Sequence, residues 1–183
     1  MILNTVTNLQ ASASSHGRGS APLLDTEGGW GQEADLPDRD EQSAFLARIY
    51  VLQAGLAVDR FVWYGWNADL SPDSLSWGKI WSPGSTAAGT LLKGGMAYRT
   101  ISNWLTNAQI SSCTNPVTGI WSCNIIRSTG KPAQILWTDS SDYVVYQVAP
   151  VYTQWRDLLT DAPTLIQSGV VTLNHKPILV EAQ

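Results

Sequence analysis

Cysteine, histidine and charged side chains are all scarce in this 183-residue chain, and each shortage excludes a class of function. The two histidines, His16 and His175, lie far apart, and no cysteine or carboxylate stands at ligand spacing, so we expect neither a metal nor a cofactor. Lysine and arginine number only 11, are scattered singly, and leave a net charge of −4. Without a basic patch, we expect the chain to bind neither nucleic acid nor an anionic membrane surface.

Several sequence motifs are missing as well. No apolar run approaches the length of a membrane-spanning helix, and the first residues lack the basic and apolar regions of a signal peptide. If the protein is secreted, we expect its export signal to lie outside this sequence. The chain also lacks the serine-hydrolase elbow, a phosphate-binding loop and a dinucleotide fingerprint.

Tryptophan is the residue type that stands out among those present. Nine tryptophans occur in a chain that is 44% apolar, which is ample for a packed core. Several of them lie beside glycine, asparagine or aspartate, as expected for loops. Tryptophan in such places suits stacking against flat apolar ligand faces, and sugar rings have such faces.

The first half of the chain alternates between helical and extended patterns. Apolar residues recur at helical spacing over residues 2–15, 41–56 and 96–107. Apolar runs at 21–26 and 59–67 predict strands, and the second run is apolar on both faces, as in a covered parallel sheet. Alternating helices and strands indicate βαβ units.

The second half is rich in short extended runs that are separated by turn residues. This pattern predicts a small antiparallel β-sandwich and places a boundary near Gln109, with domains at 1–108 and 109–183. The expected strands cover residues 120–126, 134–138, 143–148, 152–156, 170–173 and 178–180.

Cys113 and Cys123 enclose Asn-Pro and Thr-Gly pairs, which mark a turn between them. The two residues can therefore lie across a hairpin and form a disulfide, which would imply an oxidising compartment. The alternative is a pair of reduced, buried thiols.

A carboxylate and an indole follow a short apolar strand in the segment Thr26-Glu27-Gly28-Gly29-Trp30-Gly31. The glycines allow a tight exit and a close approach of a ligand, and a carboxylate beside an indole suits sugar chemistry. The alternative is an exposed strand-end glutamate beside a structural tryptophan. Asp25, two residues before Glu27, is interpreted as a structural hydrogen-bonding residue.

This segment, together with Asp59-Arg60-Phe61-Val62-Trp63-Tyr64-Gly65-Trp66-Asn67, resembles the retaining clan-A glycoside hydrolases, which include cellulase-like and xylosidase-like enzymes. The resemblance implies the last strands and helices of a (β/α)8 barrel, followed by a small antiparallel β-sandwich. It places Glu27 at the end of strand seven as the nucleophile. It places Trp63 or Trp66, at the end of strand eight, as the floor of the sugar site.

The chain departs from the family in one respect. Retaining hydrolysis needs a second carboxyl group roughly 5–5.5 Å from the nucleophile, and in this clan an Asn-Glu pair on strand four supplies it. No Asn-Glu pair occurs in this chain. We therefore expect a C-terminal fragment of a secreted O-glycosyl hydrolase, acting on poly- or oligosaccharides by double displacement. We expect this fragment alone to be inactive, and the alternative is a non-catalytic carbohydrate-binding or structural remnant.

The other candidate sugar contacts are aromatic or amide side chains near the two strand ends. At most about half of the strand-eight aromatics can reach a ligand, because successive side chains alternate between the two faces of a strand. Loop tryptophans can extend a cleft or merely anchor the loop, and an asparagine there can also be a turn residue. The full set of substrate-binding candidates is Trp30, Trp63, Trp66, Asn67, Trp77 and Trp81.

Overall fold

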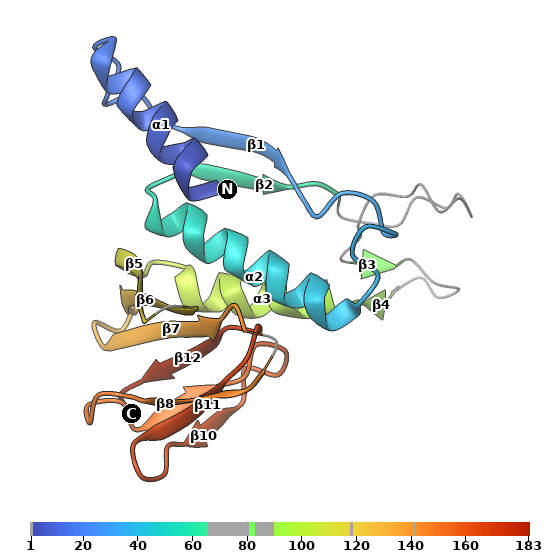
Figure 1. Cartoon of the computed structure of the whole chain (residues 1–183), viewed down its shortest axis with the longest axis vertical. Helices are drawn as coiled ribbons and strands as arrows, with labels where there is room; N and C mark the ends of the chain where they lie inside the picture. Colours follow the sequence, from blue (N-terminus) through green and yellow to red (C-terminus); the bar gives the residue numbers. More distant parts are fainter. Residues whose placement is uncertain (1, 66–80, 83–89, 118, 141) are drawn as a thin grey trace.

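The structure, a computed structural model, describes residues 2–65, 81–82, 90–117, 119–140 and 142–183. A two-stranded parallel sheet lies on one side of a helical layer, and an antiparallel sheet lies on the other (Figure 1). The α/β part precedes the all-β part in the chain. This order confirms the predicted fold class at the level of a parallel βαβ part joined to an antiparallel sheet part.

The first part contains the predicted helices and strands. Strands β1 (Leu24–Gly28) and β2 (Arg60–Trp63) pair in parallel, and helix α2 (Arg39–Gly55) forms the crossover between them (Figure 1). Helix α1 (Ile2–Ser15) precedes β1, and α3 (Lys93–Leu105) packs beside α2.

The start of α2 is fixed by its N-cap. The Asp38 carboxylate accepts hydrogen bonds from the backbone N–H groups of Asp40 and Glu41. These two acidic residues also occupy the first turn, where negative charge is favourable.

The second part forms a six-stranded antiparallel sheet in the order β10-β9-β12-β7-β6-β5. A separate two-stranded sheet, β8–β11, lies against it through the contact of β11 with β7. The strands are β5 (Gln109–Val117), β6 (Ile120–Ile126), β7 (Pro132–Thr138), β8 (Val144–Gln147), β9 (Gln154–Arg156), β10 (Pro163–Leu165), β11 (Val170–Leu173) and β12 (Ile178–Glu181).

Two strands of this sheet were not predicted, and both contain residues that normally mark turns. Strand β5 carries Asn115-Pro116 where its pairing with β6 is irregular, so the turn signal belongs to a bulge within the hairpin. Strand β10 begins at Pro163 and lies at the edge of the sheet, where a missing N–H is tolerated.

Two short strands lie between the predicted strand at 59–67 and the predicted helix at 96–107. Strands β3 (Trp81–Ser82) and β4 (Thr90–Leu91) pair in antiparallel, and α3 begins at Lys93, earlier than predicted. Residues 66–80 and 83–89 lie outside the described part of the chain.

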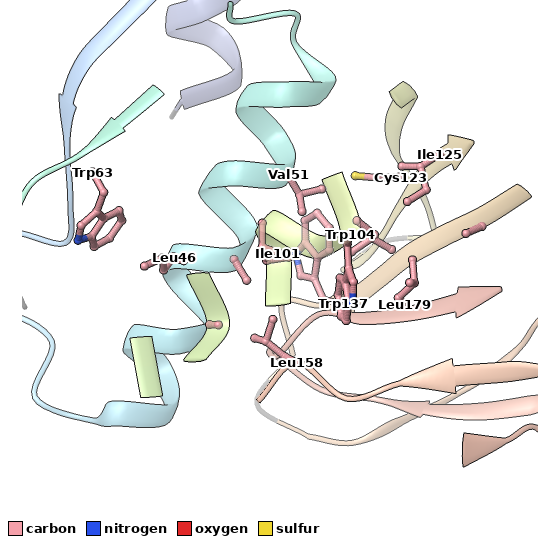
Figure 2. Packing of buried hydrophobic residues seen from close by; sticks show 14 of the residues in the cluster. Leu46, Val51, Trp63, Ile101, Trp104, Cys123, Ile125, Trp137, Leu158 and Leu179 are labelled. Carbon is pink, nitrogen blue, oxygen red and sulfur yellow. The ribbon is translucent and has the colours of Figure 1, made fainter. Parts of the chain in front are cut away.

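One hydrophobic core joins the helices to the antiparallel sheet. Val51 of α2 and Trp104 of α3 pack in the same cluster as Ile135, Trp137 and Leu179 of the sheet, each at most 1% exposed (Figure 2). The core therefore crosses the predicted boundary near Gln109, where α3 gives way to β5. The division into domains at 1–108 and 109–183 stays a prediction.

A second core lies between the six-stranded sheet and the two-stranded sheet. Leu136 and Val180, from β7 and β12, cluster with Val171 and Leu173 from β11, and all four are buried. Two layers of strands thus face each other here. A complete β-sandwich formed by residues 109–183 stays a prediction.

The helical spacing in α2 predicts one apolar face with Phe45, Ile49, Leu52 and Leu56, which Leu46 and Tyr50 widen. Leu46 is fully buried, whereas the other five are only half-buried. Val51, outside the predicted face, is fully buried as well. The difference arises because α2 packs between two layers, so its apolar residues contact neighbours on more than one side.

The predicted disulfide is confirmed. Cys113 and Cys123 are direct partners across the β5–β6 hairpin, and their sulfur atoms are 2.08 Å apart. In the part of the chain that the structure describes, no helix is both long and apolar enough to cross a lipid bilayer.

Candidate functional site

Glu27 lies near the carboxyl end of β1, where the pairing with β2 becomes irregular. Asp25 pairs with Phe61 and Gly28 with Trp63, so two residues of β1 stand opposite the single residue Val62. This is a β-bulge, a feature that re-aims side chains next to functional sites. The Glu27 side chain is exposed, and it forms no hydrogen bond or ion pair with the described residues.

A hollow of about 320 Å³ lies beside Glu27, between β1, α1 and α2. Asp25 also borders it, and its Oδ2 accepts a 2.5 Å hydrogen bond from Gln53 Nε2 of α2. This bond agrees with the interpretation of Asp25 as a structural residue. The Gln53 side chain is 2% exposed, and its Oε1 has no hydrogen-bond partner among the described residues.

The two glycines after Glu27 allow the strand ends to touch. A Cβ atom on Gly28 would lie 2.4 Å from the Phe61 ring, and one on Gly29 would lie 2.3 Å from the Tyr64 carbonyl oxygen. Neither distance is possible for a side chain. The close approach also lets the Tyr64 N–H donate a 2.8 Å hydrogen bond to the Gly28 carbonyl.

Trp30 and Trp63 meet just beyond these glycines. Their ring centroids are 4.9 Å apart, and each residue is only 8% exposed. Phe45 of α2 packs edge-on against Trp63, with the centroids 6.5 Å apart. The structure therefore places both predicted stacking residues in a buried aromatic contact, with Trp63 shown in Figure 2. Both indole N–H groups are buried without a partner among the described residues.

The aromatic contacts continue behind Trp63 into the helical layer. The Tyr50 ring of α2 packs edge-on against Phe61 and against Tyr98 of α3, with centroids 4.7 and 5.4 Å apart. Burial raises the pKa of the Tyr50 hydroxyl well above its usual range, and the neighbouring Tyr98 raises it further. Tyr50 is therefore neutral at physiological pH, and β2 rests on an uncharged aromatic layer.

Polar contacts hold the segment between β1 and α2. Glu33 forms an ion pair with Arg39, and it also accepts a 3.0 Å hydrogen bond from Gln42 Nε2. Gln42 is fully buried, and the same Nε2 donates to the Leu36 carbonyl. This network fixes the chain that leads away from Glu27.

The other predicted sugar contacts are not all described. Trp66, Asn67 and Trp77 lie outside the described residues. The Trp81 backbone lies in β3 and pairs with Leu91. Among the predicted site residues that are described, Glu27, Trp30 and Trp63 come together at neighbouring strand ends.

Among the described residues, no cluster of three or more histidine, cysteine, aspartate or glutamate side chains can hold a metal ion.

A larger cavity, of about 570 Å³, lies between α2 and the antiparallel sheet. Trp121 and Trp137, which line it, were not predicted as site residues. Each of them is eight residues from Thr129 in the β6–β7 turn. This equal spacing places them opposite each other in the hairpin, and it was the sequence signal that could have paired them.

No protein-family model matches the sequence, and no curated protein matches it. Three solved structures have a similar fold. A family 39 glycoside hydrolase from Bacteroides cellulosilyticus WH2 aligns at a TM-score of 0.71 with 19% identity, covering 88% of this chain and 34% of that one. The catalytic domain of GH30 xylanase C from Talaromyces cellulolyticus aligns at 0.55 with 10% identity, covering 88% and 41%. An alpha-amylase from Lactobacillus plantarum aligns at 0.53 with 13% identity, covering 100% and 43%.

This chain thus spans about a third to two fifths of the length of these solved chains. At these identities the likeness concerns the fold. The chain shares the fold of a part of these hydrolases, a partial barrel joined to an antiparallel sheet.

Proposed function

We propose that this chain carries the nucleophile-bearing part of a retaining glycoside hydrolase that acts on poly- or oligosaccharides, with Glu27 as the nucleophile. The observation that carries the proposal is the position of Glu27. It is an exposed carboxylate at the carboxyl end of a parallel strand, where barrel enzymes have their active sites. The glycoside hydrolases with a similar fold support the substrate class.

Glu27 would attack the anomeric carbon of the sugar and form a covalent glycosyl-enzyme intermediate, which water then hydrolyses. Asp25 is poorly suited to this role, because its carboxylate already accepts a hydrogen bond from Gln53. Trp30 and Trp63 would shape the sugar site from behind. Trp66, Asn67, Trp77 and Trp81 remain proposed sugar contacts.

The acid/base would come from further barrel strands. The two-stranded parallel sheet exposes Leu24 and Val62, and Tyr64 is exposed directly after β2; the three side chains are 49%, 43% and 45% exposed. Parallel sheets are normally covered on both faces, so this sheet is suited to continuing into a fuller barrel. A carboxyl group on such a strand would stand across from Glu27.

The disulfide supports an extracellular location for this function. Disulfides persist in oxidising compartments, and enzymes that act on polysaccharides meet their substrates there. We therefore place the protein outside the cell.

Covalent trapping tests the nucleophile without needing the acid/base. A 2-deoxy-2-fluoro-glycosyl fluoride of xylose or glucose loses fluoride without protonation, so the carboxylate alone can displace it. We expect mass spectrometry to find one glycosyl adduct, on Glu27, in the tryptic peptide that spans residues 19–39.

The Glu27→Gln variant is the matched control, and it should stay unlabelled while its melting temperature remains that of the parent. Labelling of Asp25, or equal labelling of the Glu27→Gln variant and the parent, would contradict the assignment. Binding of xylo- or cello-oligosaccharides with no adduct at all would favour the alternative, a non-catalytic carbohydrate-binding protein.

A further inference from the structure

The 570 Å³ cavity is lined by residues of α2, of the antiparallel sheet and by Thr5 of α1, and Glu27 is not among them. Its volume falls in the range of roughly 300–1,000 Å³ that is typical of small-molecule sites. The helix contributes Phe45, Ile49 and Leu52, which are half-buried, as an apolar wall.

The opposite wall carries two parallel indole rings. Trp121 of β6 and Trp137 of β7 are direct partners across the sheet, with centroids 5.6 Å apart and an angle of 6° between the ring planes. Trp137 is 1% exposed, whereas Trp121 is half-buried. The Trp121 indole N–H donates a 2.7 Å hydrogen bond to Asp139 Oδ2, which holds its ring in place. The Trp121 ring, stacked on the buried Trp137 ring, is thus the flat, rigid platform of the cavity.

The polar side chains that line the cavity are Thr5 of α1, one cation, Arg48, and one anion, Asp139. Arg48 NH1 and Asp139 Oδ1 are 4.0 Å apart, which is too far for a direct hydrogen bond. Arg48 Nε donates to the Ala44 carbonyl. The four terminal N–H groups of Arg48 form no hydrogen bond with the described residues. The cavity therefore offers spare donors and a spare acceptor beside the platform.

Three ligand classes can be compared against this arrangement. An anion would face Asp139, and a cation would face Arg48. A purely apolar molecule would take both groups out of water without giving them partners, which is unfavourable. A neutral ring that has one apolar face and vicinal hydroxyls satisfies the platform and both polar groups.

We propose that this cavity is a second, non-catalytic binding site for a neutral sugar. The apolar face of a pyranose ring stacks on the Trp121 ring, and two adjacent hydroxyls bridge Arg48 and Asp139. One hydroxyl accepts from the guanidinium, and the other donates to the carboxylate. The site does not depend on Glu27, so it stands even if the proposed hydrolase activity fails.

The indole N–H of Trp121 reports on this site in the unmodified full chain. Its amide-region signal in a ¹⁵N-labelled sample can be assigned with the Trp121→Phe variant. We expect xylotetraose or cellotetraose, titrated to millimolar concentration, to shift this signal saturably. A signal that stays in place with both sugars overturns the proposal.

Calorimetry with variants then tests the polar bridge. Arg48→Met keeps the aliphatic stem and removes the donors, and Asp139→Asn removes the charge of the acceptor. We expect each to weaken binding of the responsive tetrasaccharide at least tenfold. Asp142→Asn, at an exposed position outside the cavity lining, is the matched control and should bind it like the parent.

Unchanged affinity in both folded polar variants would overturn the proposal, as would an equal loss of affinity in Asp142→Asn. Near-ultraviolet circular dichroism checks that each variant is folded. Sodium benzoate serves as the competing anionic ring, and displacement of the tetrasaccharide by benzoate at equal concentration would also overturn it.

Discussion

Asp25 and Gln53 show how one side-chain pair positions the strand that carries Glu27. Asp25 lies two residues before Glu27 on β1, and its carboxylate is held by the buried amide of Gln53 on α2. A hydrogen bond to a charged group contributes about 1.5–3 kcal/mol to stability, and a buried group left without its partner is costly. The pair therefore ties the strand to the helix just before the candidate nucleophile.

We predict that Asp25→Ala lowers the free energy of unfolding by about 2 kcal/mol, because it leaves the Gln53 amide buried without any partner. Urea denaturation measures the loss. The double variant Asp25→Ala/Gln53→Leu removes both polar groups, and it should recover part of the stability. If the stability losses of Asp25→Ala and Gln53→Leu measured separately add up to the loss in the double variant, the two residues are not coupled.

At this scale the sequence predicted the position of Glu27 near a strand end better than the contacts around it. That position was predictable because an apolar run, a carboxylate and two glycines mark the exit of a strand. The partner of Asp25 was not predictable. It depends on the bulge opposite Val62 and on which face of α2 meets β1, and both are set by tertiary packing.

Among the elements, the β5–β6 hairpin links the antiparallel sheet to the helical layer. Its disulfide joins residues that are 10 apart in sequence. Cys113 also lies against the end of α2, as shown by the 2.7 Å distance between its sulfur and a Cβ placed on Gly55. The hairpin thus constrains both its own strands and helix α2, which connects β1 to β2.

We predict that the variant Cys113→Ala/Cys123→Ala loses about 2–3 kcal/mol of stability, which is the chain-entropy contribution of a loop of this length. Urea denaturation of oxidised parent and variant gives the difference. The parent in excess reductant should behave like the variant. A reduced parent that keeps the stability of the oxidised protein would contradict this prediction.

Prediction of the elements depended on how regular each one is. The bounds of β6 and β11 were predicted to the residue, because both are apolar runs bounded by clear turns. Strand β5 was missed, because its Asn-Pro pair is a turn signal that the hairpin absorbs as an irregularity. Local patterns cannot distinguish a bulge inside a strand from the end of that strand.

For the whole molecule, Asp40 at the start of α2 connects three parts of the structure. Its carboxylate contacts Lys93 Nζ at the start of α3, at 2.8 Å, and Lys176 Nζ before β12, at 3.2 Å. The hydrogen bond from Lys93 lowers the pKa of Asp40 below its ordinary value of 3.8, and Lys176 adds to the effect.

We predict that Asp40 makes stability fall with acid. Because its pKa is lower in the folded chain, its contribution is present above pH 3.8 and disappears as the pH falls through the folded value. The gap in melting temperature between the parent and Asp40→Asn should be largest near pH 6 and should close below pH 3.8. Asp142→Asn, at an exposed position, is the control, and a gap of constant size across this range would contradict the prediction.

The core that runs from Val51 and Trp104 to Trp137 and Leu179 has a consequence for any attempt to divide the protein. A protease cut or a redesigned terminus between residues 105 and 109 would leave the indoles of Trp104 and Trp137 facing water if the two halves separated. The halves would therefore stay associated after cleavage, held by that shared apolar interior and by polar contacts such as Asp40–Lys176. The antiparallel sheet and the helices would accordingly unfold together in a single thermal transition.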